Sequence, residues 1–181
     1  GDSACILPLK NITPGLMEEI RETTRKLALE LEVKGCINIQ YAIFKNELYV
    51  IEVNPRASRT VPFISKAIGI PLAKMATRIA MGDSLSKLGL TKEISLDRFF
   101  VKEVVLPFKK FRDADTILGP EMKSTGEVMG IGKTPGEAFF KAQEAVGNSL
   151  PLSGNMFLSV SDESKELILT EVAKLRGYPI N

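Results

Sequence analysis

The feature that most constrains the fold lies in residues 36–54, where two runs of alternating apolar and polar residues flank a short polar segment. Strict alternation is the pattern of a β-strand with one buried face, and Lys45-Asn46-Glu47 between the runs suits a turn. The sequence therefore predicts an antiparallel hairpin. The residues assigned to its apolar face are Ile37, Ile39, Tyr41, Ile43, Tyr49, Ile51 and Val53.

The length of the turn decides which polar side chains share the opposite face. With a three-residue turn, counting back along both strands pairs Gln40 with Glu52 and Asn38 with Asn54. Cross-strand partners lie about 4.5–5.5 Å apart at Cβ, so these four side chains would form one cluster. A two-residue turn would shift the register and break the cluster. We therefore predict the three-residue turn.

One carboxylate among amide oxygens is a hard-oxygen ligand set of the kind that Mg²⁺ prefers. Arg56 and Arg59 follow directly and could hold a transferring phosphoryl group or an anionic acceptor. The chain has no histidine, which excludes Ser-His or Cys-His nucleophiles and His-based zinc sites within it. These features point to phosphoryl transfer. On pattern alone, a half-exposed sheet without chemistry is the commoner explanation of such a hairpin.

Capping residues and apolar periodicity predict an α/β arrangement around this hairpin. Thr134 and Glu137 have the spacing of a capping box, and residues 148–155 have the Asn, Ser, Pro and Gly content of an interdomain linker. The predicted domains are 1–147 and 156–181. The predicted helices are 14–32, 61–68, 71–81, 84–88, 135–146 and 162–175, and the other predicted strands are 99–106, 126–132 and 156–160.

The composition excludes several partners. Lys and Arg total 24 against 22 Asp and Glu, so a net charge of +2 gives no excess that would attract nucleic acid or an anionic membrane. Charge, Gly or Pro interrupts every apolar stretch before it could span a bilayer. Cys5 and Cys36 lack metal-binding spacing and are expected to be free thiols in a reducing compartment.

Several blocks of the sequence resemble a known family. Gln40 and the run EVNPRASRT at 52–60 are similar to the metal-binding signature of the ATP-grasp enzymes. The flanking blocks narrow the resemblance to the large subunit of carbamoyl-phosphate synthase, over nearly the whole chain. These blocks are GDSA at 1–4, SKAIGIPLAK at 65–74, VKEVVLPF at 101–108 and GPEMKSTGEVMG at 119–130.

The resemblance is to the second ATP-grasp half of that family, which phosphorylates carbamate with ATP to give carbamoyl phosphate and ADP in pyrimidine and arginine biosynthesis. It implies that Gln40 and Glu52 ligate Mg²⁺ or Mn²⁺, and through the metal ATP, with Asn54 beside them. It also implies that Arg56 and Arg59 handle phosphate or carbamate. The fold it implies is the C-terminal part of an ATP-grasp domain, followed by the first βα unit of an MGS-like regulatory domain.

The same resemblance implies partners and a cellular setting. The partners are the rest of the large subunit, a glutaminase small subunit and carbamate or bicarbonate, in an oligomer. The expected compartment is the cytoplasm, or the mitochondrion for a eukaryotic ammonia-dependent form. Asp2, Glu103 and Lys165 match positions near effector sites of the family, although ordinary solvated charges explain them equally well or better.

Alternative interpretations remain open. Both ends of the sequence look cut, and the adenine-binding and glycine-rich-loop residues of the family would precede Gly1, so we expect the isolated chain to be inactive. One rival is a non-catalytic effector-binding or structural segment, which should tolerate loss of at least one residue of the set Gln40, Glu52, Asn54, Arg56 and Arg59. Another is a different ATP-grasp ligase, which the blocks after Arg59 fit less well.

Overall fold

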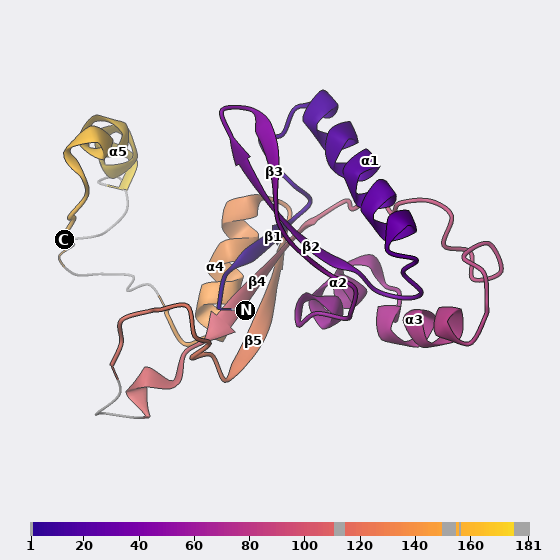
Figure 1. Cartoon of the computed structure of the whole chain (residues 1–181). Helices are drawn as coiled ribbons and strands as arrows, with labels where there is room; N and C mark the ends of the chain where they lie inside the picture. Colours follow the sequence, from indigo (N-terminus) through magenta and orange to yellow (C-terminus); the bar gives the residue numbers. More distant parts are fainter. Residues whose placement is uncertain (1, 111–114, 150–154, 156, 176–181) are drawn as a thin grey trace. The chain divides into compact units, whose positions relative to one another are not determined.

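The computed structural model describes residues 2–110, 115–149, 155 and 157–175. Contacts divide the chain into two units, Gly1–Val146 and Gly147–Asn181. The first unit holds a three-stranded sheet and a separate hairpin (Figure 1). The assignment of the two units to a catalytic and a regulatory domain stays a prediction.

The three-stranded sheet is antiparallel and has the order β1-β4-β5. Its strands are β1 (Cys5–Leu7), β4 (Phe99–Val105) and β5 (Gly126–Gly132). The predictions of β4 and β5 are confirmed. The sequence analysis missed β1, because three residues are too few to display an alternating pattern.

One face of this sheet packs against helix α2 (Thr60–Ile68). Phe100 of β4 forms a buried cluster with Phe63 and Ala67 of α2. Successive side chains of a strand point to opposite faces, so Lys102 lies on this same side of the central strand. Helix α3 (Leu72–Ala80) follows α2 directly.

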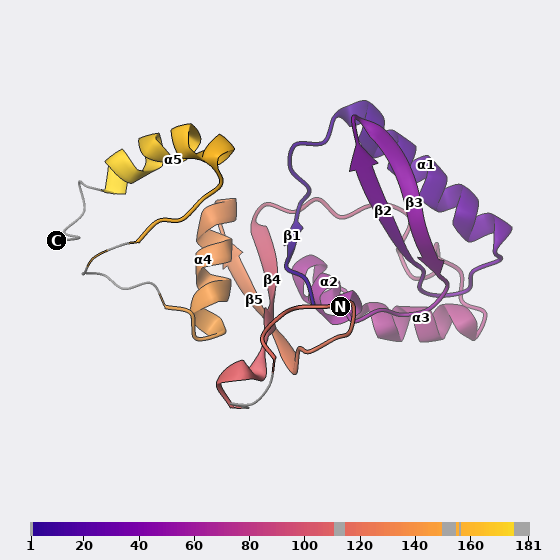
Figure 2. The same ribbon diagram turned by 60° about the vertical axis from the view of Figure 1, so that its left-hand side comes forward.

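The other face packs against helix α4 (Pro135–Ala145), as both ribbon views show (Figures 1 and 2). Val101 clusters there with Ala138 and Ala142, which are both completely buried. The close approach depends on Gly130 and Gly132, because a Cβ on Gly130 would lie 2.6 Å from the Ala142 amide nitrogen. The glycine-rich strand therefore allows α4 to pack closely against the sheet.

Thr134 caps α4, as the sequence predicts. Its Oγ1 accepts a hydrogen bond of 3.2 Å from the amide of Glu137. The Glu137 carboxylate accepts a hydrogen bond of 2.7 Å from the amide of Lys133. In a standard capping box it would accept from the amide of the N-cap residue itself, which here is Thr134. The cap therefore satisfies two otherwise unpaired backbone donors.

We expect Thr134→Ala to lower the free energy of unfolding by about 1 kcal/mol, since an alanine side chain cannot accept a hydrogen bond from the Glu137 amide. Urea denaturation of the 181-residue chain would measure the change. Thr134→Ser keeps the hydroxyl and serves as the control. An equal loss in both variants would mean that the Thr134 methyl group, and not the cap, provides the stability.

The hairpin consists of β2 (Asn38–Phe44) and β3 (Glu47–Asn54). The prediction of a three-residue turn is wrong. Lys45 and Asn46 form a two-residue turn with φ of 50° and 66°, values typical of type I′. Ile51 is an extra, unpaired residue in β3 between the partners of Gln40 and Tyr41, and this bulge restores the predicted pairing nearer the base.

The bulge also changes the faces of the hairpin. Tyr49 pairs with Ala42 and so shares the face of Gln40, contrary to its predicted apolar side. Val50 pairs with Tyr41 on the opposite face. The prediction treated β3 as regular, and beyond a bulge the alternation is reversed.

Helix α1 (Pro14–Glu30) begins after Thr13, whose hydroxyl accepts from the amide of Leu16 at 3.3 Å. This helix covers the apolar face of the hairpin, where the hydroxyls of Thr24 and Tyr41 lie 2.8 Å apart (Figure 2). Arg21 also joins Glu93 through two hydrogen bonds of 2.7 and 2.9 Å. The polar face of the hairpin points away from α1.

Two shorter predictions fail. Residues 84–88 form turns and not a helix, and Gly89 with φ of 70° follows them. Residues 157–160 have no strand assignment, while Met156 lies outside the described residues. The described part of the second unit offers no strand for them to pair with. Its helix α5 (Asp162–Leu175) has the predicted bounds. Among the described residues, no helix is both long and apolar enough to cross a membrane.

Candidate functional site

The hairpin brings the predicted polar side chains together in facing pairs. Gln40 lies opposite Glu52, and Asn38 opposite Asn54. Gln40 and Glu52 are exposed, while Asn38 and Asn54 are half-buried. Because cross-strand partners share a face, one carboxylate and three amides lie on the side away from α1.

Glu52 is available to a ligand. No cationic side chain in the described part of the chain lies within 4.0 Å of its carboxylate. The same residues contain no group of three or more His, Cys, Asp or Glu side chains that could hold a metal by themselves. A site with one carboxylate and neighbouring amide oxygens fits Mg²⁺ only where substrate phosphates and water complete the coordination. The donor set therefore fits a metal bound together with a phosphate ligand.

Arg56 and Arg59 lie at the turn between β3 and α2. The Arg56 amide donates to the Asn54 carbonyl at 2.8 Å, which turns the chain directly after the strand. The Arg56 guanidinium donates to the carbonyl of the next residue, Ala57, at 3.1 Å. Arg59 is the N-cap residue of α2, but its side chain does not cap the helix. The hydroxyl of the preceding Ser58 accepts a hydrogen bond of 3.3 Å from the amide of Thr60. Both cations thus lie close in sequence to the polar cluster.

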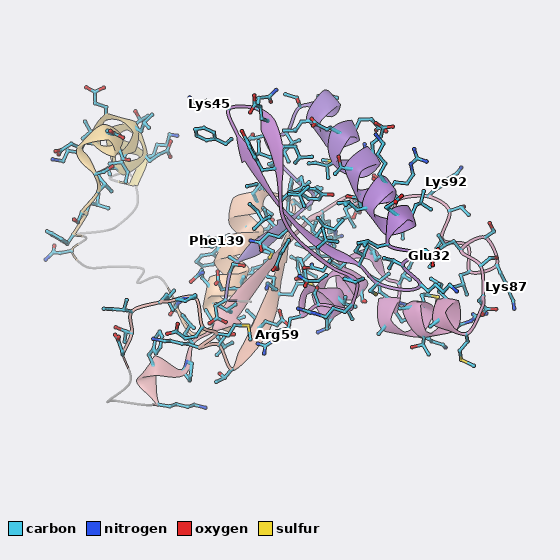
Figure 3. All side chains as sticks on the ribbon, in the orientation of Figure 1. Glu32, Lys45, Arg59, Lys87, Lys92 and Phe139 are labelled. Carbon is cyan, nitrogen blue, oxygen red and sulfur yellow. The ribbon has the colours of Figure 1, made fainter. Side chains whose placement is uncertain are left out.

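Arg59, which is labelled in Figure 3, lines a cavity of about 300 Å³. The adjacent ends of β4 and β5 line the same cavity. The other lining residues are Val104, Ser124, Thr125, Gly126 and Glu127. Serine and threonine hydroxyls, an arginine and a carboxylate give this cavity a polar lining. The sequence analysis identified Arg59 but missed these distant residues, for which it had only the resemblance of the block at 119–130.

A buried lysine adjoins the cavity. Lys102 is only 3% exposed, and its Nζ lies 3.7 Å from Oε2 of Glu127, whose side chain is 33% exposed. An ammonium group is costly to bury without an opposite charge. Glu127 therefore both pairs with the buried lysine and lines the cavity.

Comparison of the sequence with known proteins relates the chain to one family. Residues 1–88 match the family model described as the carbamoyl-phosphate synthase L chain, ATP binding domain. The carbamoyl phosphate synthase large chain of Methanospirillum hungatei is 53% identical over 96% of this chain, and that of Methanobrevibacter smithii is 55% identical over 99%. The chain belongs to the carbamoyl-phosphate synthase large-chain family.

The chain spans 16% and 17% of the length of those two large chains. A third relative, from Aquifex aeolicus, is named carbamoyl phosphate synthase large chain, C-terminal section. It is 53% identical over 96% of this chain, which spans 35% of its length. The resemblance found in the sequence is thereby confirmed over nearly all of the chain.

Solved structures support the fold. A biotin carboxylase domain of a single-chain bacterial carboxylase matches 58% of this chain and 26% of its own, with a TM-score of 0.53 and 18% identity. The urea amidolyase of K. lactis matches 78% of this chain and 10% of its own, with a TM-score of 0.62 and 18% identity. At that identity the likeness shows the fold alone. It confirms the α/β fold class predicted for this chain.

Each of the three candidate effector residues contacts another residue of its own unit. Asp2 accepts hydrogen bonds from the amides of Lys123 and Ser124, and hydrogen bonding by Ser124 is the main cause that lowers the pKa of its carboxyl. Glu103 accepts from Gln143 of α4 at 2.8 Å. In the second unit Lys165 pairs with Asp162.

Proposed function

We propose that this segment forms part of the carbamate-phosphorylating site of a longer ligase polypeptide. The reaction converts MgATP and carbamate to carbamoyl phosphate and ADP. The observation that carries the proposal is the facing pair of Gln40 and Glu52 on the exposed face of the hairpin. The printed name of the Aquifex aeolicus relative, a C-terminal section, supports placing it in the second ATP-grasp half.

In this proposal, Gln40 and Glu52 hold Mg²⁺ or Mn²⁺, with Asn54 beside them. When bound, the metal would neutralise charge on the ATP phosphates. The hairpin fixes the spacing of the donors, because both residues sit in a hydrogen-bonded ladder backed by α1. A site placed on paired strands loses little conformational entropy when it binds.

The two arginines would bind the other anions of the reaction. Arg59 lines a cavity whose size suits a small oxyanion such as carbamate. Among the described residues, the guanidinium of Arg56 donates one hydrogen bond, to a neighbouring carbonyl, so its remaining donors are available for a phosphoryl group. Holding both reactants in place would supply much of the catalysis, since phosphoryl transfer depends mainly on positioning and charge neutralisation.

The rest of the large chain is the first partner that we propose. Phe44 and Ile51 of the hairpin are 60% and 59% exposed, which suits surfaces covered by another part of the protein. We further propose a glutaminase subunit as ammonia source, bicarbonate as a substrate, an oligomer, and the cytoplasm as compartment. Residues 1–147 would be the ATP-grasp part and 156–181 the start of an MGS-like domain, with effector contacts at Asp2, Glu103 and Lys165.

The reverse reaction tests the proposal. The full-length polypeptide that carries this segment is expected to form ATP from carbamoyl phosphate and MgADP. Chelation of the divalent metal is expected to stop this reaction, and Gln40→Ala to slow it strongly while the protein stays folded. Absence of ATP formation, or full activity of Gln40→Ala, would favour the rival interpretation of a non-catalytic segment.

A further inference from the structure

Lys102 is a buried charge that the proposed reaction does not use. It lies on the central strand β4, on the face that packs against α2, and it is 3% exposed. Among the described residues its one carboxylate partner is Glu127, at 3.7 Å. An ammonium group this deeply buried is costly to keep without an opposite charge beside it.

Glu127 also belongs to the cavity that Arg59 lines. No described carboxylate lies within 4.0 Å of the Arg59 guanidinium. Arginine and a carboxylate form strong two-point hydrogen bonds when geometry permits. In this cavity the only lining carboxylate is paired with the buried lysine, and the more exposed arginine is left without a carboxylate partner.

We propose that Lys102 is a positioning residue, which holds Glu127 by an ion pair and so keeps Arg59 free to bind an anionic substrate. The substrate class is a small oxyanion, carbamate or the phosphate group of carbamoyl phosphate. This inference rests on the function proposed above. Without the ammonium group, Glu127 shares the cavity with one described cation, Arg59, and the carboxylate then competes with the substrate for it.

A purely structural pair predicts a different outcome from a positioning pair. If Lys102 and Glu127 only neutralise each other, losing the lysine harms folding and affects both substrates alike. If Lys102 restrains Glu127, replacing the lysine weakens the binding of the anion that Arg59 binds and leaves the binding of the other substrate unchanged. Removing the competing carboxylate as well then restores binding.

The first variant is Lys102→Met in the full-length polypeptide, assayed for ATP formation from carbamoyl phosphate and MgADP. We expect the KM for carbamoyl phosphate to rise about tenfold or more, and the KM for MgADP to change by less than about twofold. Lys102→Arg keeps the charge and is expected to retain most of the affinity. The matched control is Lys92→Met, because Lys92 is exposed and lies beside α1, far from Arg59 (Figure 3).

The deciding variant is Lys102→Met combined with Glu127→Gln. We expect its KM for carbamoyl phosphate to return to within about threefold of wild type, because a neutral glutamine does not compete for Arg59. This double variant leaves neither a buried ammonium group nor an unpaired carboxylate at the site, so we expect it to fold.

A double variant that binds carbamoyl phosphate as weakly as Lys102→Met, or more weakly, would overturn the positioning role. Equal rises in both KM values for Lys102→Met would also overturn it. These outcomes leave the proposed function intact if the wild-type protein makes ATP. A wild-type protein that makes no ATP overturns the proposed function and this inference together.

Discussion

Glu52→Gln in the full-length polypeptide is expected to slow ATP formation from carbamoyl phosphate and MgADP by about 10²–10³-fold, the scale seen when one strong electrostatic contact is lost. The substitution keeps the shape of the side chain and removes the only carboxylate of the hairpin cluster. Because the remaining donors are neutral amides, the affinity for a divalent cation should fall with it. Initial rates over a range of Mg²⁺ concentrations would separate weaker metal binding from slower chemistry.

Glu47→Gln is the matched control for this experiment. Glu47 is an exposed carboxylate on the same strand, near the turn, where it accepts a hydrogen bond from the Tyr49 hydroxyl at 2.6 Å. Its replacement should change the rate by less than about twofold, as expected for a surface position away from the site. Similar losses in both variants would point to a general weakening of the hairpin, and the assignment of Glu52 to the metal would fail.

The second large effect concerns the packing of β5 against α4. Gly130→Ala is expected to lower the free energy of unfolding by about 3 kcal/mol or more, as overpacking does at a site that cannot yield. The added Cβ would meet backbone atoms of Ala138 and Ala142, and the latter contact would be 2.6 Å. Urea denaturation of the chain would measure the loss.

Gly136→Ala is the control for Gly130→Ala, because it adds the same methyl group within the helix that packs against Gly130. A Cβ at Gly136 has no atom within 4 Å, and alanine favours the helix by about 0.5–1 kcal/mol over glycine. We therefore expect an unchanged or slightly higher stability. Little effect of Gly130→Ala would show that α4 can move away from the sheet without cost.

The elements with local signals were predictable from the sequence. Thr13-Pro14 and Thr134-Pro135 mark the starts of α1 and α4, since a cap and the proline after it act within one turn of helix. Gly69 marks the end of α2 for the same local reason. Strand β1 was missed because it depends on pairing with β4, more than ninety residues away.

The pairing of Gln40 with Glu52 was predicted correctly through two errors that cancel. The turn is one residue shorter than predicted, and the bulge at Ile51 adds one residue to β3. Lys45-Asn46 lacks the glycine that usually marks a type I′ turn, so composition gave no warning. Nothing in the sequence of β3 marks the bulge. The bulge is also the reason why Tyr49 lies on the face opposite to the one predicted.

The cavity behind Arg59 could not be predicted from the residue pattern. Lys102 stands beside Glu103 in a strand whose other residues are apolar, and a lysine is usually assigned to solvent. Its burial results from the helix on one side and from Glu127 on the neighbouring strand. Charge pairs between strands distant in sequence depend on tertiary structure, which local periodicity does not contain.

The bulge in β3 makes the two ends of the hairpin independent of each other. The pairing of Gln40 with Glu52 depends on the total length of residues 41–51, and not on how that length is divided between turn and strand. A three-residue turn with regular strands would give the same pairing as the two-residue turn with its bulge. The outer end can therefore change its turn, its exposed aromatic residues and whatever it contacts, while the donors at the inner end keep their spacing.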